Sequence, residues 1–179
     1  MKIAVSGAHR VGKSSLIEEL ASSLPGYRTL DEPYHLLEEE GHELAEEPSI
    51  EDFELQLERS IECMSLRDPD ILFDRCPADL LAYLLTHDDA GALDAEEWLP
   101  RARDAIELLD LVVFVPVEDR DRIPLPSSED AGWRARVDAK IRDILLENPW
   151  ELAIDVLEVT GTVRDRAQQV LAHLRATRG

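Results

Sequence analysis

The sequence predicts an α/β fold in which about five parallel strands form one sheet with helices on both faces. Two observations support this fold class. Apolar segments typical of buried strands alternate with amphipathic helical segments along the chain, and no internal repeat, long linker or low-complexity tract interrupts them. Strands that alternate with helices pair in parallel, so the helices are expected to cover both faces of the sheet. With 179 residues, the chain suits one domain that extends over residues 1–179.

The first elements follow from local signals. Residues 2–6 have three apolar residues at their centre, which predicts the first strand. A loop bounded by glycines follows at residues 7–12, and a helix is expected at about residues 13–24, where apolar side chains recur at helical spacing. The Pro-Gly pair at residues 25–26 ends this helix. A short second strand is expected at residues 27–31, closed by a Glu-Pro pair.

Residues 32–62 are strongly acidic, with twelve Asp and Glu against one Arg. Part of this segment has a helical pattern, because its apolar residues fall on one helical face. These residues are Ile50, Phe53, Leu57, Ile61 and Met64. We interpret the run of charge as the solvated side of a helix, which is its usual role, and a functional acidic cluster is the alternative.

The centre of the chain predicts two further buried strands. Residues 70–74 (DILFD) form a short apolar segment between two acids, after which Pro77 permits a helix to begin. Another helix is expected at about residues 95–109. It leads to the clearest strand of the sequence, residues 111–115 (LVVFV).

The last third of the chain supplies the remaining elements. A polar stretch at about residues 118–136 contains prolines and serines, and a helix is expected from about residue 131 to 147. Residues 152–159 predict the final strand. The pair Gly161-Thr162 then caps a closing helix. The apolar face of that helix consists of Val163, Ala167, Val170, Leu171 and Leu174.

The net charge of −20 excludes some partners. A strongly negative field repels polyanions, so we expect no binding to bulk nucleic acid or to an anionic membrane surface. The charge also suits a salt-adapted or simply a very soluble protein.

Cys63 and Cys76 lack the spacing of a zinc site or of a disulfide framework. No signal peptide or membrane-spanning segment is recognisable, so a cytoplasmic protein is expected.

One motif indicates the ligand. It matches G-x-x-x-x-G-K-[ST] at every fixed position and lies between an expected strand and an expected helix. Its glycines let backbone N–H groups turn inward around a polyphosphate, and the helix directs its positive end at the same anion. The motif predicts nucleoside-triphosphate binding in a three-layer P-loop NTPase fold. The residues expected to bind the nucleotide are Gly7, Ala8, His9, Arg10, Val11, Gly12, Lys13, Ser14 and Ser15.

Two side chains of this loop have expected chemical roles. Lys13 can reach the β- and γ-phosphates, and Ser14 can ligate Mg²⁺. A GTPase also needs an N-K-x-D motif to read guanine, and the sequence has none. A motor ATPase needs an apolar strand that ends in Asp-Glu, whereas Asp31-Glu32 follows only a weak strand.

Three further segments resemble the nucleoside and nucleotide kinases among P-loop enzymes. Residues 30–33 end a strand in Glu-Pro, Phe73-Asp74-Arg75 looks like the Asp-Arg signature after the third strand, and residues 120–136 carry arginines at the place of the lid. The sequence is most similar to the small ATPase-like kinases related to the ribosylnicotinamide kinase domain. It resembles deoxynucleoside and thymidylate kinases more distantly.

This resemblance implies roles for individual residues. Glu32 matches the general base for an acceptor hydroxyl, with Asp31 a close competitor, and a plain turn carboxylate is the alternative. Asp74 matches the carboxylate that helps to hold Mg²⁺. Arg75 matches the arginine that contacts substrate or phosphate, and the alternative is that Asp74 and Arg75 form a structural ion pair.

The resemblance also implies a lid and a base-binding region. Lid arginines in such kinases close over the transferred phosphoryl group, and the candidates for that role are Arg120, Arg122 and Arg134. Gly161 lies where these kinases pack the adenine. A helical Gln reads the base in deoxynucleoside kinases, but the match of Gln56 is loose and we expect it at the surface.

Together these observations predict a P-loop small-molecule kinase. It would transfer the γ-phosphoryl group of ATP, with Mg²⁺, to a hydroxyl or phosphate of a small-molecule acceptor. A nucleoside, a nucleotide and a similar hydroxylated metabolite are all open as acceptors, and so is the oligomeric state. One alternative is a nucleotide-binding ATPase regulator without an acceptor, whose turnover would not respond to added metabolites. Another is a GTP-binding switch, which the missing guanine motif disfavours.

Overall fold

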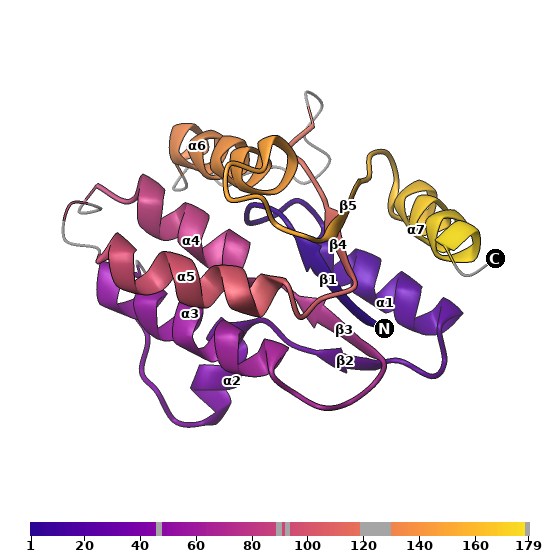
Figure 1. Cartoon of the computed structure of the whole chain (residues 1–179), viewed down its shortest axis with the longest axis horizontal. Helices are drawn as coiled ribbons and strands as arrows, with labels where there is room; N and C mark the ends of the chain where they lie inside the picture. Colours follow the sequence, from indigo (N-terminus) through magenta and orange to yellow (C-terminus); the bar gives the residue numbers. More distant parts are fainter. Residues whose placement is uncertain (46–47, 89–90, 92–93, 119–129, 178–179) are drawn as a thin grey trace.

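The computed structural model describes residues 1–45, 48–88, 91, 94–118 and 130–177, and it contains one sheet between two layers of helices (Figure 1). All neighbouring strands pair in parallel, in the order β2-β3-β1-β4-β5. This confirms the three-layer α/β class, and the first strand lies at the centre of the sheet. The strands are β1 (Lys2–Ser6), β2 (Arg28–Leu30), β3 (Ile71–Asp74), β4 (Leu111–Phe114) and β5 (Asp155–Glu158).

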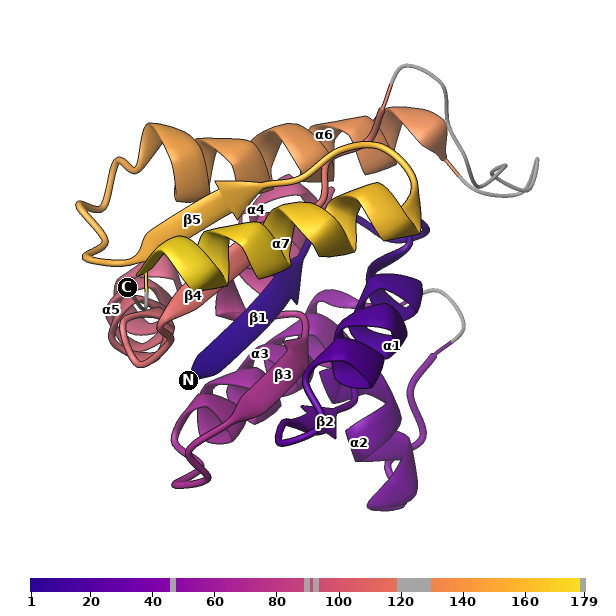
Figure 2. The same ribbon diagram turned by 90° about the vertical axis from the view of Figure 1, so that its right-hand side faces the viewer.

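The helices cover the two faces of the sheet unequally (Figure 2). On one face, α1 (Lys13–Ser23) packs against α7 (Val163–Thr177). The other layer is larger, and a π-helical turn, η2 (Asp143–Glu147), continues its last helix. This layer consists of α2 (Pro33–Glu39), α3 (Ile50–Met64), α4 (Pro77–Thr86), α5 (Ala95–Ile106) and α6 (Ala131–Arg142).

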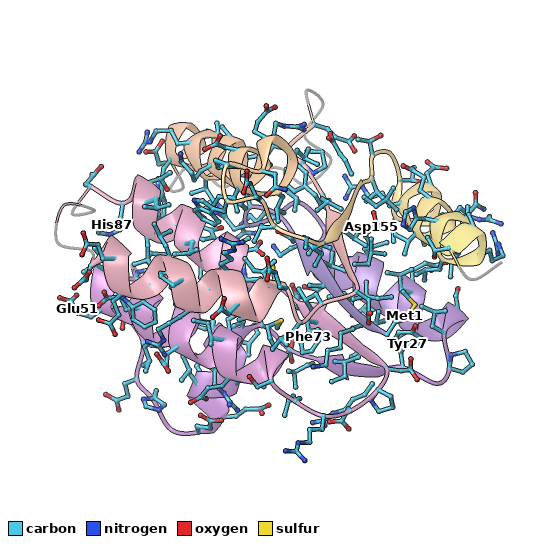
Figure 3. The ribbon with its side chains drawn as sticks, viewed as in Figure 1. Met1, Tyr27, Glu51, Phe73, His87 and Asp155 are labelled. Atoms are coloured by element: carbon cyan, nitrogen blue, oxygen red, sulfur yellow. The ribbon has the colours of Figure 1, made fainter. Side chains whose placement is uncertain are left out.

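The core lies on both faces of the three central strands. Phe73 on β3 is fully enclosed between the sheet and the helices, whereas Glu51 on α3 lies at the rim of the molecule (Figure 3). The parallel register sets Val5 opposite Asp74 on one side and Val113 on the other. The one carboxylate of β3 therefore emerges at the carboxyl edge of the sheet, beside the loop that follows β1. Ligands of open α/β sheets bind at this edge.

The sequence did not predict α2, and it placed the start of the last strand too early. Pro33 lies in the first turn of α2, where its missing N–H leaves no intrahelical bond unmade. The last strand starts at Asp155 rather than at residue 152. The side-chain amide of Asn148 accepts a hydrogen bond from the N–H of Leu152 and donates one to its carbonyl, which holds that residue in the preceding loop.

The solvated side expected for the acidic segment agrees with the structure. The described acidic residues of the 32–62 segment are exposed or half-buried, as a solvated helical side should be. Cys63 and Cys76 are both buried and free. In the part of the chain that the structure describes, no helix is long and apolar enough to cross a membrane.

Candidate active site

A cleft of about 630 Å³ opens at the carboxyl edge of the sheet. One side of it is the glycine-rich loop after β1 together with the first turn of α1. The opposite side comes from the end of β2 and from α3, α4 and the start of α6. The loop residues that line the cleft are His9, Arg10, Gly12, Lys13, Ser14 and Ser15, whereas Gly7, Ala8 and Val11 lie outside its lining.

Only glycine fits at the first position of the loop. A Cβ atom on Gly7 would lie 2.4 Å from the carbonyl oxygen of Val115, which directly follows β4. The N–H of Gly7 donates to Asp79 at 2.7 Å, and Asp79 is a fully buried carboxylate in the first turn of α4. Gly12 closes the loop in the left-handed region, with φ of +89°. The loop thus rests tightly on the ends of two buried elements.

Lys13 lies inside the loop with only 6% of its surface exposed, and its ammonium donates to the carbonyl of Ala8 at 2.9 Å. Burial lowers the pKa of Lys13 to about 8. The charge of Arg75 contributes to this lowering, whereas Asp74 and two other carboxylates oppose it. An anion bound in the loop would pair with this buried ammonium and favour its charged form.

Ser14 and Asp74 form an oxygen-rich pair beside this lysine. The Ser14 hydroxyl donates to Asp74 Oδ2 at 2.7 Å, while the buried Oδ1 atom has no hydrogen-bond partner among the described residues. Burial raises the pKa of Asp74, although Lys13 and the Ser14 hydrogen bond act against it. A hydroxyl and a carboxylate with an unused oxygen fit Mg²⁺, which keeps waters and substrate phosphates as its other ligands. The described residues contain no group of three or more His, Cys, Asp or Glu that could hold a metal ion alone.

Glu32 and Arg75 form an ion pair on the opposite side of the cleft, and both line it. The Nε atom of Arg75 donates to Glu32 Oε2 at 2.6 Å, and its Nη1 atom donates to the carbonyl of Gly7 at 3.2 Å. Burial alone would raise the pKa of Glu32, but the charge and hydrogen bond of Arg75 outweigh it and lower the pKa. Glu32 is therefore an anionic carboxylate near the glycine-rich loop, which is called the phosphate loop below. Arg75 lies in the cleft, and its shortest described ion pair is with Glu32 rather than with the adjacent Asp74.

The two candidate bases differ in position. Glu32 is 24% exposed and lines the cleft, whereas Asp31 is exposed and is not part of the described lining. The sequence alone could not decide between these two carboxylates, because they are adjacent in the chain.

An aromatic wall faces the loop across the cleft. The rings of Phe53 and Tyr83 stack with centroids 5.2 Å apart and planes 10° apart. Trp133 packs edge-on against both rings, at 6.1 and 5.6 Å. The Tyr83 hydroxyl also accepts a hydrogen bond from the N–H of His9 at 2.8 Å, so the wall touches the loop directly. Sequence reasoning did not identify Tyr83 as part of the site.

The surface position expected for Gln56 is wrong. This side chain is only 5% exposed, lines the cleft and donates to the carbonyl of Asp52 at 3.2 Å. The sequence spacing indicated this burial, because a residue three positions after Phe53 lies on the same helical face. The apolar pattern hid this polar member of the face, and Ile61, assigned to the face, is only half-buried.

The arginines expected in the lid have different outcomes. Arg120 and Arg122, with most of the 118–136 segment, lie outside the described residues. Arg134 is 2% exposed on α6 and donates to the carbonyls of His9 and Arg10 at 2.9 and 3.0 Å. Backbone atoms of the loop are therefore among its partners.

Two more residues near the loop complete the description. Gly161, expected near the adenine, has φ of +99°, donates its N–H to Glu118 at 2.7 Å and is not part of the described cleft lining. Arg166 on α7, which the sequence did not single out, is 4% exposed and donates to the carbonyl of Val11 at 2.6 Å.

Comparisons with known proteins agree with this architecture. A family model described as an AAA domain matches residues 2–166. No curated protein matches the chain. Deoxyadenosine kinase from M. mycoides with bound dATP superposes with a TM-score of 0.64 at 16% identity, over 98% of this chain and 100% of that one. Thymidylate kinase from Candida albicans superposes with a TM-score of 0.63 at 18% identity, over 98% and 91%. At these identities the likeness establishes that this chain shares its fold with these two kinases.

Proposed function

The chain belongs to the AAA domain family, and from this premise we propose that it is a P-loop small-molecule kinase. It uses ATP and Mg²⁺, and its acceptor is a nucleoside, a nucleotide or a similar hydroxylated metabolite. The observation that carries the proposal is the meeting of two surfaces in one cleft: a polyphosphate loop and a wall that bears Glu32 and three aromatic rings. A plain ATPase needs only the first surface.

The donor side of the cleft binds the polyphosphate. Backbone N–H groups of the loop and the ammonium of Lys13, which lines the cleft, would neutralise its charge. Ser14 and Asp74 would hold Mg²⁺, which supplies positive charge to the phosphates when bound, and the unused Oδ1 atom of Asp74 supports this assignment.

The acceptor side removes a proton and orients the acceptor. Glu32 takes the proton of an acceptor hydroxyl as the phosphoryl group arrives, and Arg75 keeps this carboxylate anionic and fixed. Its place in the cleft supports Glu32 over Asp31 for this role. Arg120 and Arg122 stay candidates for the lid arginine that stabilises the transferred group.

The aromatic wall suits a planar ring. A wall of stacked and edge-on aromatic side chains favours a flat heteroaromatic group packed against it, and the neighbouring Gln56 amide can both donate to and accept from such a ring. These side chains support a nucleobase-bearing acceptor.

The experiment measures ADP formation from MgATP against a panel of nucleosides, nucleotides and small hydroxylated metabolites. We expect one acceptor class to stimulate turnover and Lys13→Ala to abolish it. In Glu32→Gln, kcat should fall by about 100-fold or more while MgATP still binds, because only the proton acceptor is lost. Asp31→Asn is the matched control and should retain activity. ADP release that responds to no acceptor would favour the regulator and contradict the kinase.

A further inference from the structure

Cationic side chains hold the carbonyl side of the phosphate loop. Each of the five consecutive carbonyls from Gly7 to Val11 accepts a hydrogen bond from a lysine or an arginine. Lys13 and Arg75 bind the first two carbonyls and also line the cleft. The other three are held by Arg134 and Arg166, which do not line it.

These two arginines approach the loop from opposite layers of the fold. Arg134 on α6 bridges the carbonyls of His9 and Arg10, and Arg166 on α7 binds the carbonyl of Val11. The second guanidinium is itself fixed, because its Nη2 atom donates to Glu118 Oε1 at 2.9 Å. The same carboxylate oxygen accepts the N–H of Gly161 at 2.7 Å.

The geometry of an anion-binding loop explains why its carbonyls need such partners. When successive N–H groups turn inward toward an anion, their carbonyls are directed to the opposite side, and buried carbonyls must be hydrogen-bonded. Arg10 also has φ of +55°, a conformation that residues other than glycine adopt only where the surroundings hold them. A planar guanidinium with several donors can hold two carbonyls at once, which an ammonium cannot do with the same rigidity.

We propose that Arg134 and Arg166 are positioning residues that hold the loop in its anion-binding conformation before the nucleotide arrives. They set nucleotide affinity from outside the cleft, without touching the nucleotide. This inference rests on the proposed nucleotide-binding function. It gives Arg134 a different role from that of a lid arginine.

The first test compares MgATP affinity in the full-length protein with Arg134→Lys, Arg134→Gln, Arg166→Lys and Arg166→Gln. We expect MgATP to bind roughly tenfold more weakly or worse in all four variants, while the acceptor KM changes by less than about threefold. Lysine keeps the charge but not the rigid double contact, so the lysine variants separate positioning from charge alone. They also serve as folded substitutes wherever a glutamine variant does not fold.

The second test needs no ligand. Amide hydrogen exchange is measured at Gly7 and His9, whose N–H groups donate to Asp79 and Tyr83. In the variants these two amides should exchange about tenfold faster, whereas the amides of β3 and β4 should be unchanged. A merely structural contribution to stability would speed exchange across the sheet as well.

Matched controls remove the same charge from the same helices. Arg142 on α6 pairs with Glu158, and Arg164 on α7 is exposed. Arg142→Gln and Arg164→Gln should leave both the MgATP affinity and the loop exchange as they are in the wild type.

Each other outcome has a defined meaning. Wild-type affinity and wild-type loop exchange in the four variants would overturn the inference, and so would full recovery of affinity in both lysine variants. If the wild-type protein binds no MgATP, the proposed function fails. The exchange data alone then decide whether the two arginines order the loop.

Discussion

We expect Lys13 to make nucleotide binding sensitive to mildly alkaline pH. Burial, with the charge of Arg75, lowers the pKa of Lys13 to about 8, so the ligand-free loop loses its ammonium above that pH. We expect the affinity for MgATP to fall as pH rises beyond about 8, by up to about tenfold per unit. Titrations of the dissociation constant between about pH 6.5 and 9.5 measure this. In Lys13→Met, binding should be weak and should lack this pH dependence, and a wild-type profile in that variant would contradict the assignment.

The same pKa acts on stability with the opposite sign. The folded value of about 8 lies below the ordinary lysine pKa of 10.5, so the unfolded chain binds more protons between these pH values. Stability from this group therefore rises with pH across that window, because the cost of burying the charge disappears. Nucleotide binding and ligand-free stability thus change in opposite directions as Lys13 titrates.

Gln56 is expected to contribute to acceptor choice. Replacing it with leucine keeps the approximate volume but removes the amide from the cleft. For a nucleobase-bearing acceptor, Gln56→Leu should raise KM by about tenfold or more, because polar atoms of the ring lose their partner. The dissociation constant for MgATP should change little. Gln168→Leu, at an exposed position of α7, is the control, and an equal rise in KM there would contradict a role in the cleft.

At the scale of elements, the contact between the loop and the end of β4 demands glycine. A Cβ atom on Gly7 meets the carbonyl oxygen of Val115, a backbone atom that cannot move without disturbing the sheet. Gly7→Ala should therefore destabilise the fold by about 2 kcal/mol or more, which urea unfolding can measure. Gly26→Ala is the comparison, because a Cβ atom there meets nothing within 4 Å. Equal losses in both variants would contradict this steric explanation.

Elements with strong local signals could be predicted from the sequence. The central strands are nearly continuous apolar runs because both faces of a parallel sheet are covered, and the glycine-rich motif marks the turn into α1. The helix α2 could not be predicted, since its short acidic sequence gives no periodic signal. The burial of Gln56 was missed because its neighbours on the helical face are apolar.

Contacts that connect distant elements could not be predicted either. Arg134 and Arg166 bind carbonyls that lie 125 and 155 residues away along the chain. In the sequence, Arg134 is one of several lid candidates, and Arg166 resembles an ordinary surface arginine on a helix. Only the layered arrangement of α6 and α7 around the loop brings them to their partners.

At the scale of the whole molecule, charge repulsion is the dominant electrostatic feature. The chain has 39 acidic residues against 19 basic ones, of which only three are lysines. Surface ion pairs such as Arg101–Glu58 and Arg59–Glu40 cannot neutralise this excess. Net repulsion at low ionic strength opposes the compact state.

We therefore expect stability to rise with salt. The Debye screening length falls from about 10 Å at 0.1 M salt to about 3 Å at 1 M. The long-range repulsion therefore weakens more than the attraction within the few close ion pairs does. The urea midpoint should increase between about 0.1 and 1 M KCl. A parallel titration with sucrose is the control. Sucrose is excluded from the protein surface but carries no charge, so it does not screen the repulsion. A midpoint that falls with KCl would show that the ion pairs outweigh the repulsion.

The short edge strand β2 has a consequence for how such a protein can change during evolution. It has three residues, lies at the margin of the sheet beside β3, and leads directly into Glu32 and α2. The phosphate loop, in contrast, follows β1, which two neighbours enclose. Substitutions or insertions after β2 break few backbone hydrogen bonds, whereas changes around β1 disturb the centre of the molecule. The segment around Glu32, which borders the acceptor side of the cleft, can therefore diverge between lineages more easily than the loop proposed to bind the donor.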